Sequence, residues 1–97
     1  MAIFTLSDQL ALGLFEGAKK MGLSIPGDLS VVGFDDVPEA SRTDPPLTTV
    51  YQPHVEKGLL AGRMLVAQLR GEEPPSPEPL PTRLVVRGST APPKTGM

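Results

Sequence analysis

The sequence predicts an α/β domain with a mainly parallel sheet, on three observations. In the apolar run at residues 29–34, Val31 and Val32 have no polar residue between them, as in a strand buried on both faces. A helical pattern over residues 9–21 separates that run from another apolar run at residues 2–6. This strand–helix–strand spacing is typical of a right-handed unit whose two strands are parallel.

The first half of the chain carries clear signals for the ends of its elements. Ser7 and Asp8 follow the first strand, and either side chain can cap the helix that begins there. Gly22 supplies a left-handed cap at the other end of the helix. The expected apolar stripe of this helix is Leu10, Leu14, Ala18 and Met21. A second apolar line through Leu12 and Phe15 fits either a partner surface or a helix buried deeply on its sheet.

The second half of the chain predicts two further strands and one helix. Residues 37–47 are expected to form an irregular loop, and residues 48–52 a third strand. A helix follows at residues 54–70, with Gly71 as its cap. Its apolar stripe consists of Val55, Leu59, Gly62, Val66 and Leu69. Residues 72–81 form a stiff proline-rich connector, residues 83–87 a last strand, and residues 91–97 a frayed tail.

The composition excludes several classes of function. The net charge of −2 leaves this stretch without an electrostatic footprint for DNA. Three phenylalanines and one tyrosine are too few for a platform that binds single-stranded nucleic acid. With no cysteine and one histidine, no metal-ligand spacing is present. No apolar run approaches the roughly 20 residues that a membrane helix needs.

No motif indicates an enzyme or a cofactor. No serine lies in a nucleophile-elbow pattern, and no glycine-rich phosphate loop follows an expected strand. The lone His54, beside Pro53, is interpreted as a residue of the helix start. Asp35 and Asp36 follow the central strand at its carboxyl end, the edge where open α/β sheets bind ligands. Taken by themselves they are better explained as solvated turn residues, because aspartate is common in turns.

Four motifs resemble the lactose-repressor/galactose-repressor family of transcription regulators. They are residues 7–13 (Ser-Asp-Gln-Leu-Ala-Leu-Gly), 25–36 (Ile-Pro-Gly-Asp-Leu-Ser-Val-Val-Gly-Phe-Asp-Asp), 45–50 (Pro-Pro-Leu-Thr-Thr-Val) and 84–90 (Leu-Val-Val-Arg-Gly-Ser-Thr). In this order they span nearly the whole chain, but they resemble only the last third of such a regulator. The helix-turn-helix domain and most of the sensor core are absent, so we expect the chain to be a fragment.

The resemblance implies a partial periplasmic-binding-protein-like fold, Rossmann-like and mainly parallel. Residues 1–50 would belong to the C-terminal lobe of a sensor that holds an effector between two lobes. Residues 51–73 would form a hinge crossing and a helix of the N-terminal lobe. Residues 74–90 would form the proline-rich connector and the returning strand, and residues 91–97 the tail.

The resemblance also implies site residues. Asp35 matches the family's aspartate that binds effector hydroxyls, and Asp36 is expected to stabilise the loop. Ser7 stands where many members carry asparagine, and Gln52 matches a polar residue at the hinge. The implied dimer interface comprises the first helix and the loop after the central strand, here Leu12, Phe15, Glu39, Arg42 and Thr43.

The function so implied is effector sensing and dimerisation in a cytoplasmic regulator that is no enzyme and uses neither metal nor cofactor. Its partners would be a sugar-like or nucleoside-like effector and a second copy, as a homodimer or as an oligomer that swaps the helix at residues 54–70. DNA would be contacted only through the absent helix-turn-helix domain, and no membrane is expected. Two alternatives stay open: a fragment of a periplasmic-type sugar-binding protein, and a standalone interaction module. The pairing of Phe-Asp-Asp with Pro-Pro-Leu-Thr-Thr favours the regulator. The sequence does not identify the effector.

Overall fold

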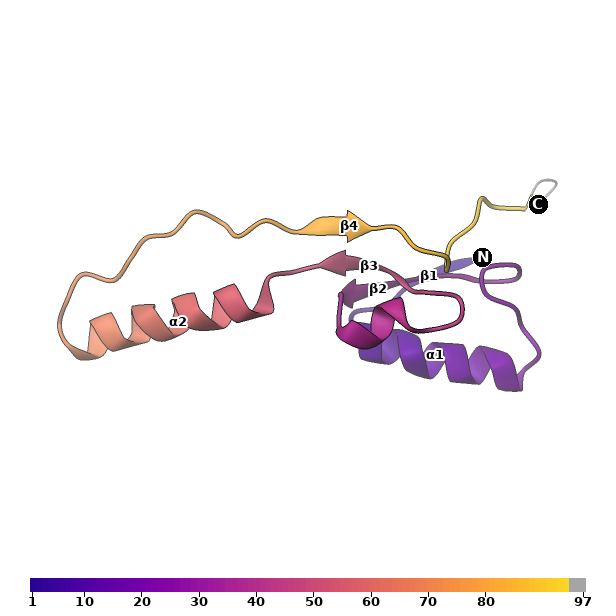
Figure 1. The fold of residues 1–97 in the computed structure, drawn as a ribbon, viewed down its shortest axis with the longest axis horizontal. Helices are drawn as coiled ribbons and strands as arrows, with labels where there is room; N and C mark the ends of the chain where they lie inside the picture. Colours follow the sequence, from indigo (N-terminus) through magenta and orange to yellow (C-terminus); the bar gives the residue numbers. More distant parts are fainter. Residues whose placement is uncertain (95–97) are drawn as a thin grey trace. The chain divides into compact units, whose positions relative to one another are not determined.

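The computed structural model describes residues 1–94, which divide into two compact units (Figure 1). The sheet unit comprises residues 1–51 together with the chain from Arg83 onward. The helix unit comprises Gln52–Thr82. Each unit is a separate body and is considered on its own.

The sheet unit contains four strands in the order of the sequence. They are β1 (Ala2–Phe4), β2 (Ser30–Asp35), β3 (Thr48–Tyr51) and β4 (Arg83–Val85). β1 and β3 both pair with β2 in parallel, whereas β4 runs antiparallel to β3. The prediction of an α/β fold with a mainly parallel sheet is therefore confirmed. Because β1, β2 and β3 are parallel, their carboxyl ends lie at one edge of the sheet.

Helix α1 (Asp8–Lys20) connects β1 to β2 and begins and ends on the expected signals. The Ser7 side chain accepts a hydrogen bond from the N–H of Leu10, and Gly22 has a φ of 73° beyond the last turn. The buried face differs from the predicted stripe, because Leu10 and Met21 are exposed. The face that packs on the sheet consists of Ala11, Leu14, Phe15 and Ala18. Small alanine side chains let the helix approach the strands closely.

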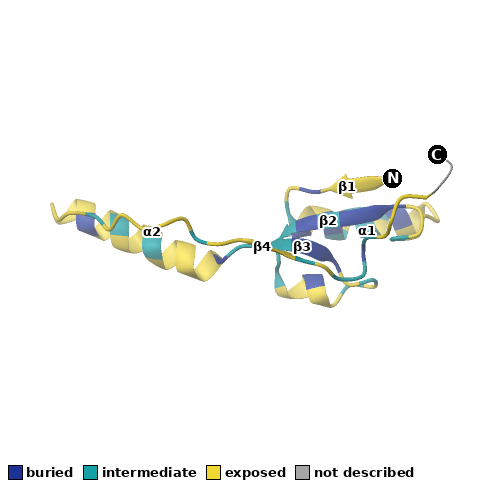
Figure 2. Cartoon of the chain, turned by 90° about the horizontal axis from the view of Figure 1, so that it is seen from above, coloured by how far each residue is buried: buried dark blue, intermediate teal, exposed yellow. Residues whose placement is uncertain are grey.

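The core lies between α1, β2 and the chain that follows β2. It consists of the buried residues Ala11, Leu29, Val31, Ala40 and Leu47. Val31 is buried but Val32 is only half-buried, and all of β1 is exposed at the edge of the sheet (Figure 2). The sequence predicted that β2 is buried on both faces. In the structure, β2 is fully buried only on the face that packs against α1.

The chain after β2 contains a 3₁₀ helix, η1 (Pro38–Ser41), where the sequence predicted an irregular loop. Pro38 stands at its start, where the fixed φ of proline suits a helix and the missing N–H costs nothing. The hydroxyl of Ser41 donates to the carbonyl of Pro38 (3.0 Å), and Ala40 is buried in the core. A single short turn has no helical period for sequence reasoning to detect.

Buried polar contacts fix the chain after β4 to the sheet. Ser89 is fully buried; its hydroxyl donates to the carbonyl of Val31 (2.6 Å) and accepts from the N–H of Thr48 (2.8 Å). The N–H of Ala91 donates to Ser30 Oγ (3.0 Å). The predicted tail therefore begins later than residue 91, since Ala91 is held on the sheet. Residues 95–97 of that tail lie outside the described residues.

The helix unit consists of α2 (His54–Leu69) and the extended chain that follows it. Gly71 caps the helix with a φ of 70°, as predicted. The residues of the predicted apolar stripe are largely exposed: Val55, Leu59, Val66 and Leu69 each expose more than two-fifths of their surface. Within the described part of the chain, no helix is long and apolar enough to cross a membrane.

Asp28, in the turn before β2, makes a pH-dependent contribution to stability. The pKa of Asp28 lies below its ordinary value of 3.8. The largest cause is the hydrogen bond that the N–H of Ser24 donates to Oδ2, followed by the one from the Ser24 hydroxyl and by the contact with Lys94. Because this pKa is lower in the folded than in the unfolded protein, the Asp28 carboxylate stabilises the fold at pH values above 3.8. The stabilisation is lost as the pH falls through the pKa of the folded protein. We expect Asp28→Asn to lower the Tm near neutral pH and the deficit to shrink below pH 3.8. Thermal melts across pH test this, and a deficit that does not depend on pH would contradict it.

Candidate functional site

Asp35 ends β2 at the carboxyl edge of the sheet, where it pairs with Tyr51 of β3. Its φ is 129°, and the next residue, Asp36, has a φ of 61°. Residues with a side chain rarely adopt positive φ, and two in succession are costly unless neighbours fix them. Such strain concentrates at functional sites, so the Asp35–Asp36 turn is the most informative backbone feature of the sheet unit.

Two side chains from distant parts of the sequence hold this turn. Asp36 Oδ1 accepts a hydrogen bond from the guanidinium of Arg87 at 2.8 Å, and the two side chains are largely buried. This contact fits the loop-stabilising role expected for Asp36. The N–H of Val37, directly after the turn, donates to Asp8 Oδ2 at 2.8 Å. The turn is therefore anchored to both α1 and the chain that follows β4.

Asp8, for which the sequence predicted only a possible capping role, is a structural centre of the sheet unit. It is fully buried, and its Oδ1 accepts from the hydroxyl of Thr49 at 2.6 Å. Gly33 leaves the space for this carboxylate, because a Cβ at Gly33 would collide with Asp8 Oδ1 and lie 2.9 Å from Leu47. The signal in the sequence was the glycine inside an apolar strand, which marks a close approach.

Ser7 and Asp35 lie at the same edge of the sheet, since they follow or end neighbouring parallel strands. Ser7 Oγ accepts from the N–H of Leu10 at 3.2 Å as the cap of α1. A hydroxyl that accepts one hydrogen bond can still donate its own proton. The capping role and a ligand contact are therefore compatible at Ser7.

Gln52 is the first residue of the helix unit and directly follows Tyr51 in the chain. Its Oε1 accepts from Lys57 Nζ at 2.7 Å, on the first turn of α2. Of the three predicted ligand residues, Ser7 and Asp35 thus belong to one unit and Gln52 to the other.

The residues of the predicted dimer interface fall into two groups. One open hollow of about 680 Å³ is lined by Leu12 and Phe15 of α1 and by Thr43, in the loop after η1. Glu39 and Arg42, in and after η1, are exposed and do not line it. The second apolar line of α1 thus borders an open surface at Leu12 and Phe15.

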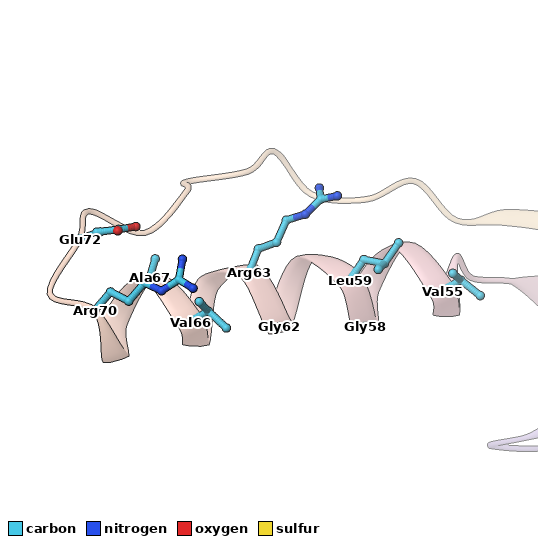
Figure 3. Close-up of a pocket in the computed structure, with 9 residues that line it drawn as sticks. All are labelled: Val55, Gly58, Leu59, Gly62, Arg63, Val66, Ala67, Arg70 and Glu72. Atoms are coloured by element: carbon cyan, nitrogen blue, oxygen red, sulfur yellow. The ribbon is translucent and has the colours of Figure 1, made fainter.

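A second hollow, of about 690 Å³, lies along α2 (Figure 3). Val55, Leu59 and Val66 line it, with Arg63 and Arg70 among its charged residues. Its apolar residues Val55, Leu59 and Val66 are members of the apolar stripe predicted for the helix.

Within residues 1–94, no three His, Cys, Asp or Glu side chains are grouped so that they could hold a metal ion.

Residues 1–90 match the periplasmic binding protein-like domain family. The chain is 47% identical over 91 residues to the HTH-type transcriptional regulator MalR of Streptomyces coelicolor, which covers 93% of the chain and 26% of MalR. It is 38% identical to the lactose operon repressor of Rhizobium radiobacter, covering 95% of the chain and 81% of that sequence. The chain thus spans about a quarter of the length of the first of these relatives.

Solved structures agree with these matches in fold and sequence. A LacI family transcriptional regulator from Enterococcus faecium with bound ribose has a TM-score of 0.85 and 37% identity, covering 96% of this chain and 35% of that one. The CelR–cellobiose complex has a TM-score of 0.78 and 37% identity, covering 91% of this chain and 27% of that one. The lac repressor dimer bound to operator and anti-inducer has a TM-score of 0.78 and 35% identity, covering 92% and 31%.

Proposed function

The chain belongs to the periplasmic binding protein-like domains of the lactose-repressor/galactose-repressor family, and from this premise we propose that it is part of the effector sensor of a transcription regulator. The effector would be a sugar or another small polyhydroxylated molecule. The observation that carries this proposal is the position of Asp35 at the carboxyl edge of a parallel sheet, which is the edge where open α/β sheets bind ligands. Its backbone has a positive φ, a conformation that persists only where neighbouring contacts fix it.

The chemistry of a carboxylate suits such an effector. Two oxygens accept hydrogen bonds from adjacent hydroxyls, and charge-assisted bonds of this kind are short and strong. Ser7 adds a hydroxyl donor at the same edge of the sheet. The ribose and cellobiose bound by two similar regulators support the same class of ligand.

The rest of the protein would supply the remaining functions. With a net charge of −2, the chain itself lacks the phosphate-neutralising charge that DNA binding needs, so operator binding is assigned to a helix-turn-helix domain outside it. The regulator would act in the cytoplasm, where its operator is, without catalysis. The matched relatives are regulators, and this favours the sensor of a regulator over a transport protein or a standalone interaction module.

We also propose that the face around Leu12, Phe15 and Thr43 contributes to a homodimer, with Glu39 and Arg42 at its rim. The open hollow that Leu12 and Phe15 line supports this, because a partner that fills it would cover their apolar surface. The dimer in the solved lac repressor complex supports the same assembly. Exchange of α2 between copies is the alternative mode of assembly.

For the full-length protein, we expect Leu12→Glu to raise the dimer dissociation constant by about tenfold or more, because Leu12 lines the hollow and a charge there would be buried in the interface. Leu10→Glu is the matched control, because Leu10 is exposed on the same helix and does not line the hollow. Sedimentation measures both variants. A Leu12→Glu variant that dimerises like the wild type would reject this interface.

The function itself is tested by calorimetry on the full-length protein with a panel of ribose, cellobiose, other mono- and disaccharides, and nucleosides. The proposal predicts saturable binding of at least one member, and a change in operator affinity when that member is present. Binding of none of them would contradict the proposal.

A further inference from the structure

Arg87 connects three segments of the sheet unit that lie far apart in the sequence. Its guanidinium donates to Asp36 Oδ1 at 2.8 Å and to the carbonyl of Leu47 at 3.0 Å. Its backbone N–H donates to the hydroxyl of Thr48 at 2.9 Å. The arginine side chain is 20% exposed and that of Asp36 16%, so the ion pair is partly shielded from water. A planar guanidinium with several donors suits such a contact, whereas lysine offers only a point charge.

The contact reaches the strained turn directly. Asp35 and Asp36 have φ values of 129° and 61°, which residues with a side chain adopt only where other contacts fix them. The pairing of Asp36 with Arg87 is such a contact, because it holds the carboxylate of the second strained residue. On the other side, Asp8 holds the N–H of Val37. Asp35, the last residue of β2, therefore begins a turn that Arg87 and Asp8 fix from two sides.

Arg87 also stands where the chain returns from the helix unit. It follows β4 (Arg83–Val85), which is the first element after Gln52–Thr82. Within the sheet unit, the ion pair thus connects the turn beside the candidate ligand residue to the chain that follows β4.

We propose that Arg87 is a positioning residue: its pairing with Asp36 fixes the Asp35–Asp36 turn in the conformation that binds a polyhydroxylated ligand. This inference rests on the proposed ligand role of Asp35. Arg87 acts on the ligand only through Asp36 and the turn.

The first test is backbone amide hydrogen exchange of the full-length protein over the peptide that contains residues 35–37. We expect Arg87→Gln and Asp36→Asn to speed exchange there to a similar extent, and the double variant to add little. Arg87→Lys should fall between the wild type and Arg87→Gln. Lys94→Gln is the matched control, since it removes a cation from the exposed ion pair with Asp28. Exchange that Arg87→Gln leaves unchanged would overturn the proposal.

The second test is calorimetry with the sugar of the panel that the wild type binds, at a temperature where each variant is folded. We expect Arg87→Gln to weaken affinity by about tenfold. A lowered Tm with unchanged affinity would overturn the proposal, because Arg87 would then be purely structural. If Asp35→Asn weakens binding and Arg87→Gln does not, only this inference fails. If the wild type binds no sugar or nucleoside, the proposed function fails and the ligand part of this inference fails too. The exchange test then still decides whether Arg87 orders the turn.

Discussion

Replacing Asp8 with alanine is expected to lower the free energy of unfolding by about 3 kcal/mol, because one buried and one partly buried donor lose their acceptor at once. The N–H of Val37 and the hydroxyl of Thr49 both donate to this carboxylate, which is fully buried. The same change leaves a cavity next to Gly33, whose missing Cβ makes room for the carboxylate. Chemical denaturation followed by circular dichroism measures the effect.

Two variants make that measurement specific. Asp8→Asn keeps the shape and one acceptor oxygen, so we expect a loss between those of the wild type and the alanine variant. Gln9→Ala changes an exposed neighbour on the same helix and should alter stability little. If Asp8→Ala costs no more than Gln9→Ala, Asp8 is not the structural centre that its contacts indicate.

Asp35→Asn in the full-length protein is expected to weaken effector affinity by about ten- to a hundredfold. The substitution is nearly isosteric, so packing is spared, but a charged acceptor becomes a neutral group that is partly a donor. Calorimetry with the sugar that the wild type binds measures the change. Asp28→Asn is the matched control, since Asp28 precedes β2 at the opposite end of the strand and is exposed. Unchanged affinity in Asp35→Asn would reject Asp35 as a ligand residue.

The elements that the sequence predicted well are those with local signals. Ser7 and Gly22 define the ends of α1 through contacts within a few residues, and the apolar run around Val31 predicted β2. The parallel pairing followed from the length of the connection between strands. The position of Asp35 at the carboxyl edge followed from its place after that run. For these features the information lies within one element or its immediate neighbours.

The features that were missed depend on partners far away in the sequence. Thr49 lies 41 residues from Asp8, Arg87 lies 51 residues from Asp36, and Ser89 lies 58 residues from Val31. No periodicity predicts such pairs, because each polar residue has many possible partners until the fold places them. The wrong stripe on α1 has a related cause. Leu14 and Ala18 of that stripe do face the sheet, but close packing selected Ala11 beside them, whereas hydrophobicity alone favoured Leu10 and Met21, which are exposed.

The central claim is that the Asp35 carboxylate binds the hydroxyls of a small effector at the carboxyl edge of the sheet. A crystal structure of the full-length protein with its sugar bound tests this most directly. We predict that both oxygens of Asp35, or one of them twice, accept hydrogen bonds from ligand hydroxyls while Asp36 stays paired with Arg87. A sugar bound with full occupancy that makes no contact with Asp35 would contradict the claim.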